Sequence, residues 1–161
     1  MKTLGDLLEH QLKNIFSAED QYLQVLPLMI HNIGNQELKM AFENNHIKTI
    51  SHQIRIKEIC DELKINCEGD RCFVLDSLIM EAKHFMEGKM EECVMDTGIF
   101  ARAQRIAHYK IASYATAMQY AKEMAYDDIA AILFQIHKEE NIAYKKLTRI
   151  AENRMSNKVV L

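Results

Sequence analysis

The sequence predicts an all-α fold, with four long helices in a bundle and one shorter helix in the crossover between the second and third. The 161 residues include one proline and five glycines, so few positions interrupt a helix. Apolar residues recur at steps of three and four, and no stretch has the Val- and Thr-rich alternation that is typical of strands. A chain of this length corresponds to a single domain over residues 1–161.

The first long helix is expected from about Thr3 to His31, with Pro27 bending it near its end. Its apolar face consists of residues at helical spacing, namely Leu4, Leu8, Leu12, Ile15, Tyr22, Leu26 and Met29. The stretch "IGNQE" interrupts this pattern. The second long helix is therefore expected from about Gln36 to Leu63.

The stretch "KINCEGDRC" then connects to the short helix "FVLDSLIMEAKHFMEG", which is expected to end near Gly88. The third long helix is expected over roughly 91–124 and the fourth over roughly 127–153. Asp127 or Asp128 lies near the start of the last helix, where the helix dipole favours an acid. Residues 154–161 are expected to fray.

The composition excludes several classes of partner. The formal charge is −3, with 20 basic and 23 acidic side chains, so the chain lacks the cationic excess that binds nucleic acid. No stretch approaches the roughly 18 apolar residues of a membrane span. The first ten residues, "MKTLGDLLEH", contain acids where a signal peptide is apolar. We expect a soluble, cytoplasmic protein that binds neither nucleic acid nor membrane.

The four cysteines, Cys60, Cys67, Cys72 and Cys93, form no C-x-x-C pair. In a cytoplasmic chain of this size we interpret them as reduced thiols that pack as small hydrophobic side chains. Cys67 and Cys72 flank the stretch "EGDR", where the alternative is a redox or zinc role.

Two acidic side chains are expected on buried helix faces. Glu19 lies on the apolar face of the first helix, and Glu140 interrupts the apolar face of the last one. A carboxylate in a core is costly unless it is paired, protonated or coordinated to a cation. The two acids therefore require a shared partner, whereas Glu139, one position further round the helix, is expected to be more exposed.

Lys110 lies on the apolar face of the helix over 91–124. Its ammonium group could form a buried ion cluster with Glu19 and Glu140 and supply the positive charge that these carboxylates need. The alternative is that Lys110 extends along its aliphatic stem into solvent.

The helix over 36–63 allows two orientations. One turns a polar group toward the core, namely His46, Thr49 and Gln53. The other turns three isoleucines toward the core, namely Ile47, Ile50 and Ile54. In the first orientation these isoleucines would form an exposed apolar row, which predicts a protein partner, most simply a homodimer. Glu43 and His46 also have the i, i+3 spacing of a carboxylate and imidazole metal pair.

Three further side chains flank the expected cluster. His108 is about 100° round its helix from Ala107, where a hydrogen bond to a neighbouring helix is expected. Tyr109 and Tyr114 are interpreted as packing groups with a polar tip.

Several segments resemble, in order and over nearly the whole chain, the YciF/YciE family of bacterial ferritin-like bundles. They are "SAEDQYLQVLPLM", "KMAFENN", "CFVLDSLIMEA", "ARAQRIAHYKIASYAT" and "HKEENIAYKKLTRIA". The resemblance implies a ferritin-like four-helix bundle, often dimeric, that is associated with stress responses and carries a carboxylate-bridged centre of the di-iron type. It also implies that Glu19, Glu139 and Glu140 stand at acidic positions of that centre.

The sequence departs from the family pattern in two helices. The family motif resembles E-H-Y-E, but here Ala107 and Lys110 stand where its two acids would be. The family segment H-L-E-E-T aligns with "NHIKT" at residues 45–49, which contains no acid. A di-iron carboxylate site uses about four acids and two imidazoles. An ammonium group within such a site would repel the metal cations.

The sequence thus predicts a stress-associated bundle protein that has lost its di-metal centre, binds no cofactor and is not an enzyme. The alternative is an oxidase or peroxide-handling protein that holds one or two iron ions through Glu19, Glu43, His46, Glu139 and Glu140. The two hypotheses differ in whether Glu43 and His46 point toward Glu19.

Overall fold

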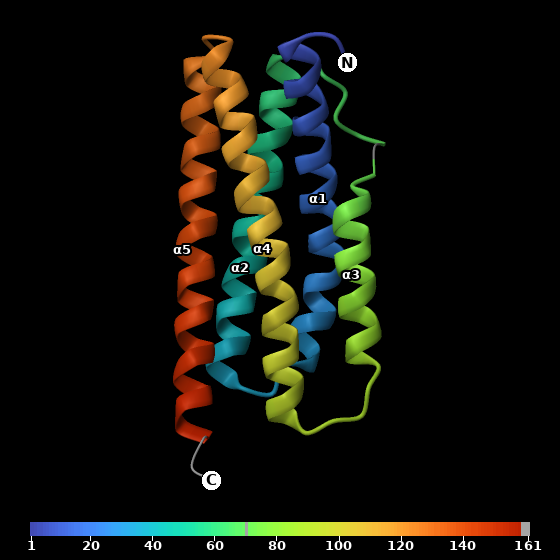
Figure 1. Ribbon diagram of the computed structural model, residues 1–161, viewed down its shortest axis with the longest axis vertical. Coiled ribbons are helices and arrows are strands. Elements are labelled where there is room, and N and C mark those ends of the chain that lie inside the picture. The colour runs from blue at the N-terminus through green and yellow to red at the C-terminus, as the bar shows by residue number, and fades with distance from the viewer. Residues whose placement is uncertain (70, 159–161) are drawn as a thin grey trace.

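The computed structural model describes residues 1–69 and 71–158, and this part of the chain contains five α-helices and no strand (Figure 1). They are α1 (Leu4–Asn32), α2 (Gln36–Glu62), α3 (Phe73–Met86), α4 (Glu92–Glu123) and α5 (Asp127–Lys158). The predicted all-α class and all five predicted helices are confirmed. The expected end of the last helix at residue 153 is wrong, because α5 continues to Lys158; residues 159–161 of the expected frayed tail lie outside the described residues.

The four long helices form a ring in which α1 packs against α2 and α4, and α5 closes the ring between α2 and α4. Helix α3 lies outside this ring, against α1 and α4. In Figure 1, α3 carries the chain back along the bundle, so that α2 and α4 run in the same direction. The arrangement is that of a ferritin-like bundle with an additional short helix in the crossover.

Local capping groups set where the first two helices begin. The Thr3 hydroxyl accepts a hydrogen bond from the Asp6 amide at 3.1 Å, and the Asp6 carboxylate accepts one from the Thr3 amide, which is a capping box. The Asn35 side chain caps α2 by accepting from the Leu38 amide. Asp96 of α4 is buried and accepts from the amides of Gly34 and Asn35, so it fixes the turn between α1 and α2 to α4.

Two hydrophobic clusters fill the bundle, one towards each end. One includes Leu26, Met29 and Phe42, and the other includes Leu12 and Leu133. Buried polar side chains lie between these two clusters, at the middle of the long helices. The candidate site is therefore enclosed by apolar side chains above and below.

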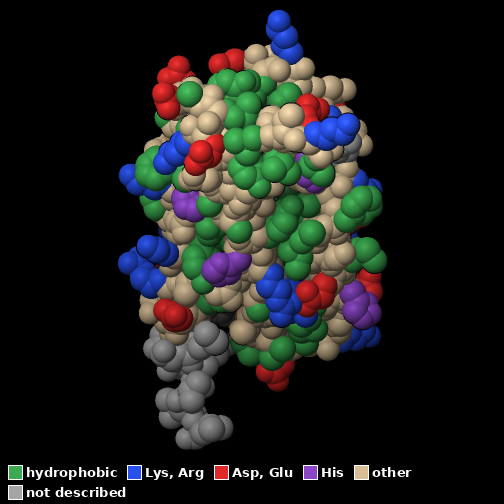
Figure 2. Space-filling model, turned by 45° about the horizontal axis from the view of Figure 1, so that its top comes forward, with side chains coloured by type: hydrophobic (Ala, Val, Ile, Leu, Met, Phe, Trp, Pro, Cys, Tyr) green, Lys and Arg blue, Asp and Glu red, His purple; other side chains and the backbone are tan. Residues whose placement is uncertain are grey.

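The surface mixes charges of both signs. On the face drawn in Figure 2, Lys and Arg side chains alternate with Asp and Glu, and hydrophobic side chains reach the surface between them. Within the described residues, no helix combines the length and the apolar character that a membrane span requires.

Candidate functional site

The centre of the bundle contains an ammonium group between two carboxylates. Lys110 Nζ from α4 lies 2.9 Å from Glu19 Oε2 on α1 and donates a hydrogen bond of 2.7 Å to Glu140 Oε1 on α5. Glu19 is 0% exposed, Lys110 2% and Glu140 3%. The alternative in which Lys110 reaches solvent is wrong, because its charge is balanced inside the core by these two acids.

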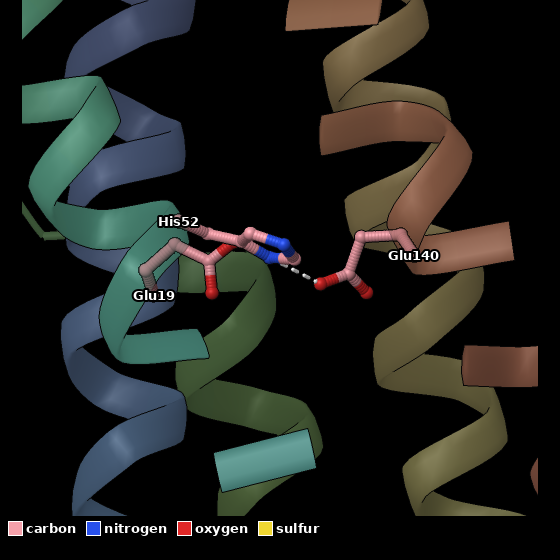
Figure 3. A group of neighbouring side chains, drawn as sticks. All are labelled: Glu19, His52 and Glu140. Atoms are coloured by element: carbon pink, nitrogen blue, oxygen red, sulfur yellow. Dashed lines mark ion pairs between the residues drawn. The ribbon is translucent and has the colours of Figure 1, made fainter. Parts of the chain in front are cut away.

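His52 of α2 is the fourth member of this group, and Glu19, His52, Lys110 and Glu140 are together called the ion cluster below. Figure 3 shows that Glu19, His52 and Glu140 converge from three different helices. His52 Nδ1 lies 2.8 Å from Glu140 Oε1, and His52 Nε2 lies 2.9 Å from Glu139 Oε2. The contact of Nε2 with Glu139 has hydrogen-bond geometry, whereas Nδ1 lies close to Glu140 without forming a hydrogen bond.

Glu139 connects the ion cluster to the surface. Besides His52, its carboxylate accepts hydrogen bonds from the Arg55 guanidinium, at 2.5 Å from Nη2, and from Gln135 Nε2 at 3.0 Å. About a quarter of the Glu139 side chain is exposed, as expected from its position beside Glu140. Three acids, Glu19, Glu139 and Glu140, thus face two cations, Lys110 and Arg55, and the imidazole of His52.

Two buried tyrosines surround the ammonium group. The Tyr114 hydroxyl donates a hydrogen bond of 2.6 Å to Glu19 Oε1, so Tyr114 contributes more than the packing predicted for it. The Tyr22 ring centroid lies 5.1 Å from Lys110 Nζ, within range of a cation–π interaction. Asn45 Nδ2 in turn donates to the Tyr22 hydroxyl at 3.1 Å. Glu19 and Lys110 are therefore each contacted by a tyrosine that is itself packed in the core.

Burial and mutual attraction act against each other on the ionisable groups. Burial raises the pKa of Glu19, and the nearby Lys110 charge does not cancel this effect. Burial would also raise the pKa of Glu140, but Lys110 and His52 together hold it at about 2. Burial would lower the pKa of Lys110, yet the two carboxylates raise it above its ordinary value. Lys110 and Glu140 thus form the ion pair in which both groups stay charged, and Glu19 is the carboxyl group that is protonated more readily.

The Glu139 carboxylate is expected to make stability depend on pH. Burial would raise its pKa, but hydrogen bonds from Arg55, Gln135 and His52 lower it to about 2. Because this is below the unfolded value, Glu139 stabilises the fold above about pH 4.5, and this contribution is lost as the pH falls through 2. Glu139→Gln is expected to lower the free energy of unfolding by about 1–3 kcal/mol at pH 6 and to have no effect near pH 2.

Urea denaturation of wild type and variant at several pH values measures this difference. Glu9→Gln is the matched control, because Glu9 makes an exposed i, i+4 pair with Lys13 whose loss should be small at every pH. If the loss of unfolding free energy in Glu139→Gln has the same size from pH 6 to pH 2, the stabilisation does not come from a Glu139 carboxylate with a lowered pKa.

The other predicted site residues lie away from the ion cluster. Glu43 is exposed and His46 is half-buried, so the alternative hypothesis, which requires both to point toward Glu19, loses these two ligands. His108 is exposed and its ring packs edge-on against Tyr144, with 4.6 Å between centroids. The Tyr109 hydroxyl lies 3.0 Å from Cys72 Sγ, between α4 and the start of α3. None of these four side chains belongs to the ion cluster as the structure describes it.

Helix α2 adopts the first of the two predicted orientations only in part, because Thr49 faces the core and the three isoleucines are exposed, but His46 and Gln53 are not buried. Its buried polar side chains are Asn45, Thr49 and His52. His46 and Gln53 are therefore turned away from the position expected for them, while Ile47, Ile50 and Ile54 are 66%, 42% and 52% exposed. Most of its buried positions are spaced alternately by four and three residues, namely Leu38, Phe42, Asn45, Thr49, His52, Ile56 and Ile59, and Ala41 and Cys60 lie beside this row.

The donor set of the ion cluster can be compared with that of a metal centre. Ligand atoms of Glu19, His52 and Glu140 lie within 4.8 Å of one another, which is close enough for one metal ion. Lys110 Nζ, however, lies within 2.9 Å of both carboxylates, in the position from which a cation would bind them. Two acids and one imidazole also fall short of the roughly four acids and two imidazoles of a di-iron site. The side chains as arranged do not fit a di-iron centre.

Comparison with known proteins assigns the chain to a family. The family described as a domain of unknown function, DUF892, matches residues 3–160. The chain is 32% identical to Protein YciF of Escherichia coli strain K12 over 160 residues, which covers 98% of this chain and 96% of that protein. The protein belongs to the YciF family. The family resemblance predicted from the sequence is thereby confirmed.

Solved structures of YciF-type proteins have the same fold. The crystal structure of the E. coli stress protein YciF matches with a TM-score of 0.93 and 31% identity, over 98% of this chain and 100% of the other. YcfI of Rhodopseudomonas palustris matches with a TM-score of 0.87 and 32% identity, over 100% of this chain and 97% of the other. These matches confirm the ferritin-like helical bundle over the full length of the chain.

Proposed function

We propose that this protein is a non-enzymatic, stress-associated bundle protein of the cytoplasm, in which the ion cluster takes the place of a di-metal centre. One observation carries the proposal: Lys110 Nζ lies 2.9 Å from Glu19 and 2.7 Å from Glu140. The ammonium group supplies the positive charge that buried acids need, so the fold requires no metal ion. Function would then depend on the surface of the bundle and on its protein partners rather than on redox chemistry.

Electrostatic repulsion supports the exclusion of metal. Two unit charges about 4 Å apart interact by about 4 kcal/mol at an effective dielectric constant of 20, so a divalent ion beside Lys110 would be repelled by about 8 kcal/mol. The raised pKa of Lys110 makes loss of its proton an unfavourable way to relieve this repulsion. Metal would therefore have to displace the whole side chain from the core.

The similar proteins support the physiological part of the proposal. The E. coli relative is described as a stress protein, and the R. palustris relative as a proposed structural protein. Neither description includes an enzymatic activity. A structural or partner-binding role during stress is consistent with a bundle whose polar centre is neutralised by its own side chains.

Elemental analysis tests the exclusion of metal. The protein would be expressed in medium supplemented with iron, purified without chelator, and analysed for iron, manganese and zinc by mass spectrometry. We expect well below one ion of each metal per folded chain. One or two ions per chain would overturn the proposal.

A second candidate function is metal binding by Glu19, His52 and Glu140, whose ligand atoms already lie within 4.8 Å of one another. The protein would then be an oxidase or a peroxide-handling protein with one metal ion, most simply iron, and Lys110 would swing out of the core. Stoichiometric binding of Fe(II), Mn(II) or Zn(II) in a calorimetric titration, abolished by Glu19→Ala, would support this function. Binding that Glu19→Ala leaves unchanged would exclude it.

We also propose that the protein forms a homodimer through the outer face of α2. Ile47, Ile50 and Ile54 are exposed at successive turns of this helix, and a solvent-exposed apolar row is typical of a contact surface. Sedimentation velocity at high micromolar concentration should show a dimer for wild type. The double variant I50E/I54E should be monomeric with an unchanged helical circular dichroism spectrum. Monomeric wild type would contradict this proposal.

A further inference from the structure

The chain reverses direction at the end of α2. Lys64 has a positive φ of 57°, and the Ile65 amide donates a hydrogen bond of 2.8 Å to the Cys60 carbonyl, as in a Schellman turn. Lys57 Nζ then lies 4.0 Å from Glu68 Oε1. These two contacts show that residues 65–68 run back alongside the last turns of α2. The reversal brings Cys67 next to Cys60.

Cys60 and Cys67 lie in the same part of the core. Both belong to the hydrophobic cluster that also contains Leu12 and Leu133, and the chain reversal brings position 67 back toward position 60. Cys60 is 0% exposed and Cys67 is 1% exposed. Two thiols that are neighbours in the folded chain need little further ordering to form a covalent bond.

Cys67 borders a cavity that communicates with the surface. Cys67 lines a cavity of about 300 Å³ together with Ser17 and Asp20 of α1 and with Glu68 and Gly69, which are exposed. A small oxidant that enters this cavity meets Cys67, whereas Cys60 is not one of the residues that line it. Burial also raises the pKa of the Cys60 thiol, which makes Cys60 the less reactive thiol toward peroxide.

We propose that Cys60 and Cys67 are an oxidative modification site, in which hydrogen peroxide converts the two thiols to a disulfide. The Cys67 thiolate attacks one peroxide oxygen, which forms an S–O bond, breaks the O–O bond and releases water after protonation. The Cys60 sulfur then attacks the sulfenic sulfur of Cys67, the S–O bond breaks, and the leaving hydroxide takes the Cys60 proton. In total, two thiols and one peroxide give one disulfide and two waters.

The other two cysteines provide internal controls. Cys72 Sγ contacts the Tyr109 hydroxyl at 3.0 Å, and Cys93 Sγ donates a weak hydrogen bond to Glu91 Oε2 at 3.9 Å. Each of these thiols is thus next to an oxygen rather than next to a second sulfur. Oxidation at Cys72 or Cys93 should stop at sulfenic or sulfinic acid.

Peptide mapping of the full-length wild-type protein tests the proposal. The folded protein would be treated with hydrogen peroxide, unfolded, alkylated with iodoacetamide, digested and analysed by mass spectrometry with and without dithiothreitol. We expect loss of two of the four free thiols and a peptide pair linked through Cys60 and Cys67, which dithiothreitol releases. Full alkylation of Cys60 and Cys67 after peroxide treatment, or sulfinic acid at Cys67 without a linked pair, would overturn the proposal.

Two variants assign the order of the steps. Cys60→Ser should leave Cys67 as a sulfenic acid that dimedone labels, and Cys93→Ser should form the same disulfide as wild type. Circular dichroism reports whether each variant folds; if Cys60→Ser does not, the wild-type map alone decides. In a Cys67→Ser variant, dimedone labelling of Cys60 as fast as that of Cys67 in Cys60→Ser would overturn the assignment of Cys67 as the first thiol.

Discussion

Lys110→Ala is expected to lower the free energy of unfolding at pH 7 by about 3–5 kcal/mol, because it leaves two buried carboxylates without a counter-charge. Wild-type Lys110 contacts both Glu19 and Glu140 at less than 3 Å in a fully buried setting. The loss should shrink as the pH is lowered, since protonation then neutralises the acids that Lys110 no longer balances. Urea denaturation followed by circular dichroism at pH 7 and pH 5 measures both effects.

Two matched variants separate charge from packing. Lys13→Ala removes a lysine from an exposed i, i+4 pair with Glu9 and is expected to cost less than about 1 kcal/mol. The triple variant E19Q/K110M/E140Q removes all three charges at similar volume and should recover much of the stability that Lys110→Ala loses. If Lys110→Ala is no more harmful than Lys13→Ala, Lys110 does not balance the two acids.

Lys110→Glu is expected to convert the ion cluster into a metal site. The variant would combine three carboxylates, from residues 19, 110 and 140, with the imidazole of His52, which is a donor set suited to Fe(II), Mn(II) or Zn(II). Without metal, three buried acids should make the variant much less stable than wild type. With metal at about 100 times the Kd, binding should restore about 2.7 kcal/mol and raise the Tm.

Thermal unfolding with and without each metal, together with the metal content per chain, measures this gain. Wild type is the first control and should show no rise in Tm. The second control is Lys110→Glu combined with His52→Ala. This double variant lacks the nitrogen ligand, so added metal should no longer raise its Tm. A Lys110→Glu variant that unfolds at the same temperature with and without metal would show that the scaffold cannot form a metal site.

The sequence is sufficient to predict the helices and the two central acids. Glu19 and Glu140 interrupt apolar faces that are otherwise unbroken, so their burial follows from helical periodicity alone. Lys110 is identified in the same way on α4. Their mutual contact could be expected because buried charges of opposite sign on neighbouring helices stabilise one another. The apolar periodicity of α1, α4 and α5 thus predicts, in each helix separately, one charged residue at the centre of the bundle.

The same reasoning left two rotations of α2 open and placed the wrong polar side chains in its buried face. This helix has apolar side chains on its outer face as well as its inner one, and Ile47, Ile50 and Ile54 gave a regular stripe that turned out to be exposed. His52 was missed because it has no partner within its own helix; its partners, Glu139 and Glu140, are about 87 positions further along the chain. Buried Asp96 was missed for the same reason, since it contacts the backbone of Gly34 and Asn35.

A crystal structure of the wild-type protein soaked in Fe(II) without oxygen, with an anomalous difference map at the iron edge, tests the central claim most directly. We expect Lys110 Nζ between Glu19 and Glu140, as in the present structure, and no anomalous peak within the ion cluster. An anomalous peak between Glu19, His52 and Glu140, with Lys110 displaced from the core, would show instead that the family's metal centre persists in this protein.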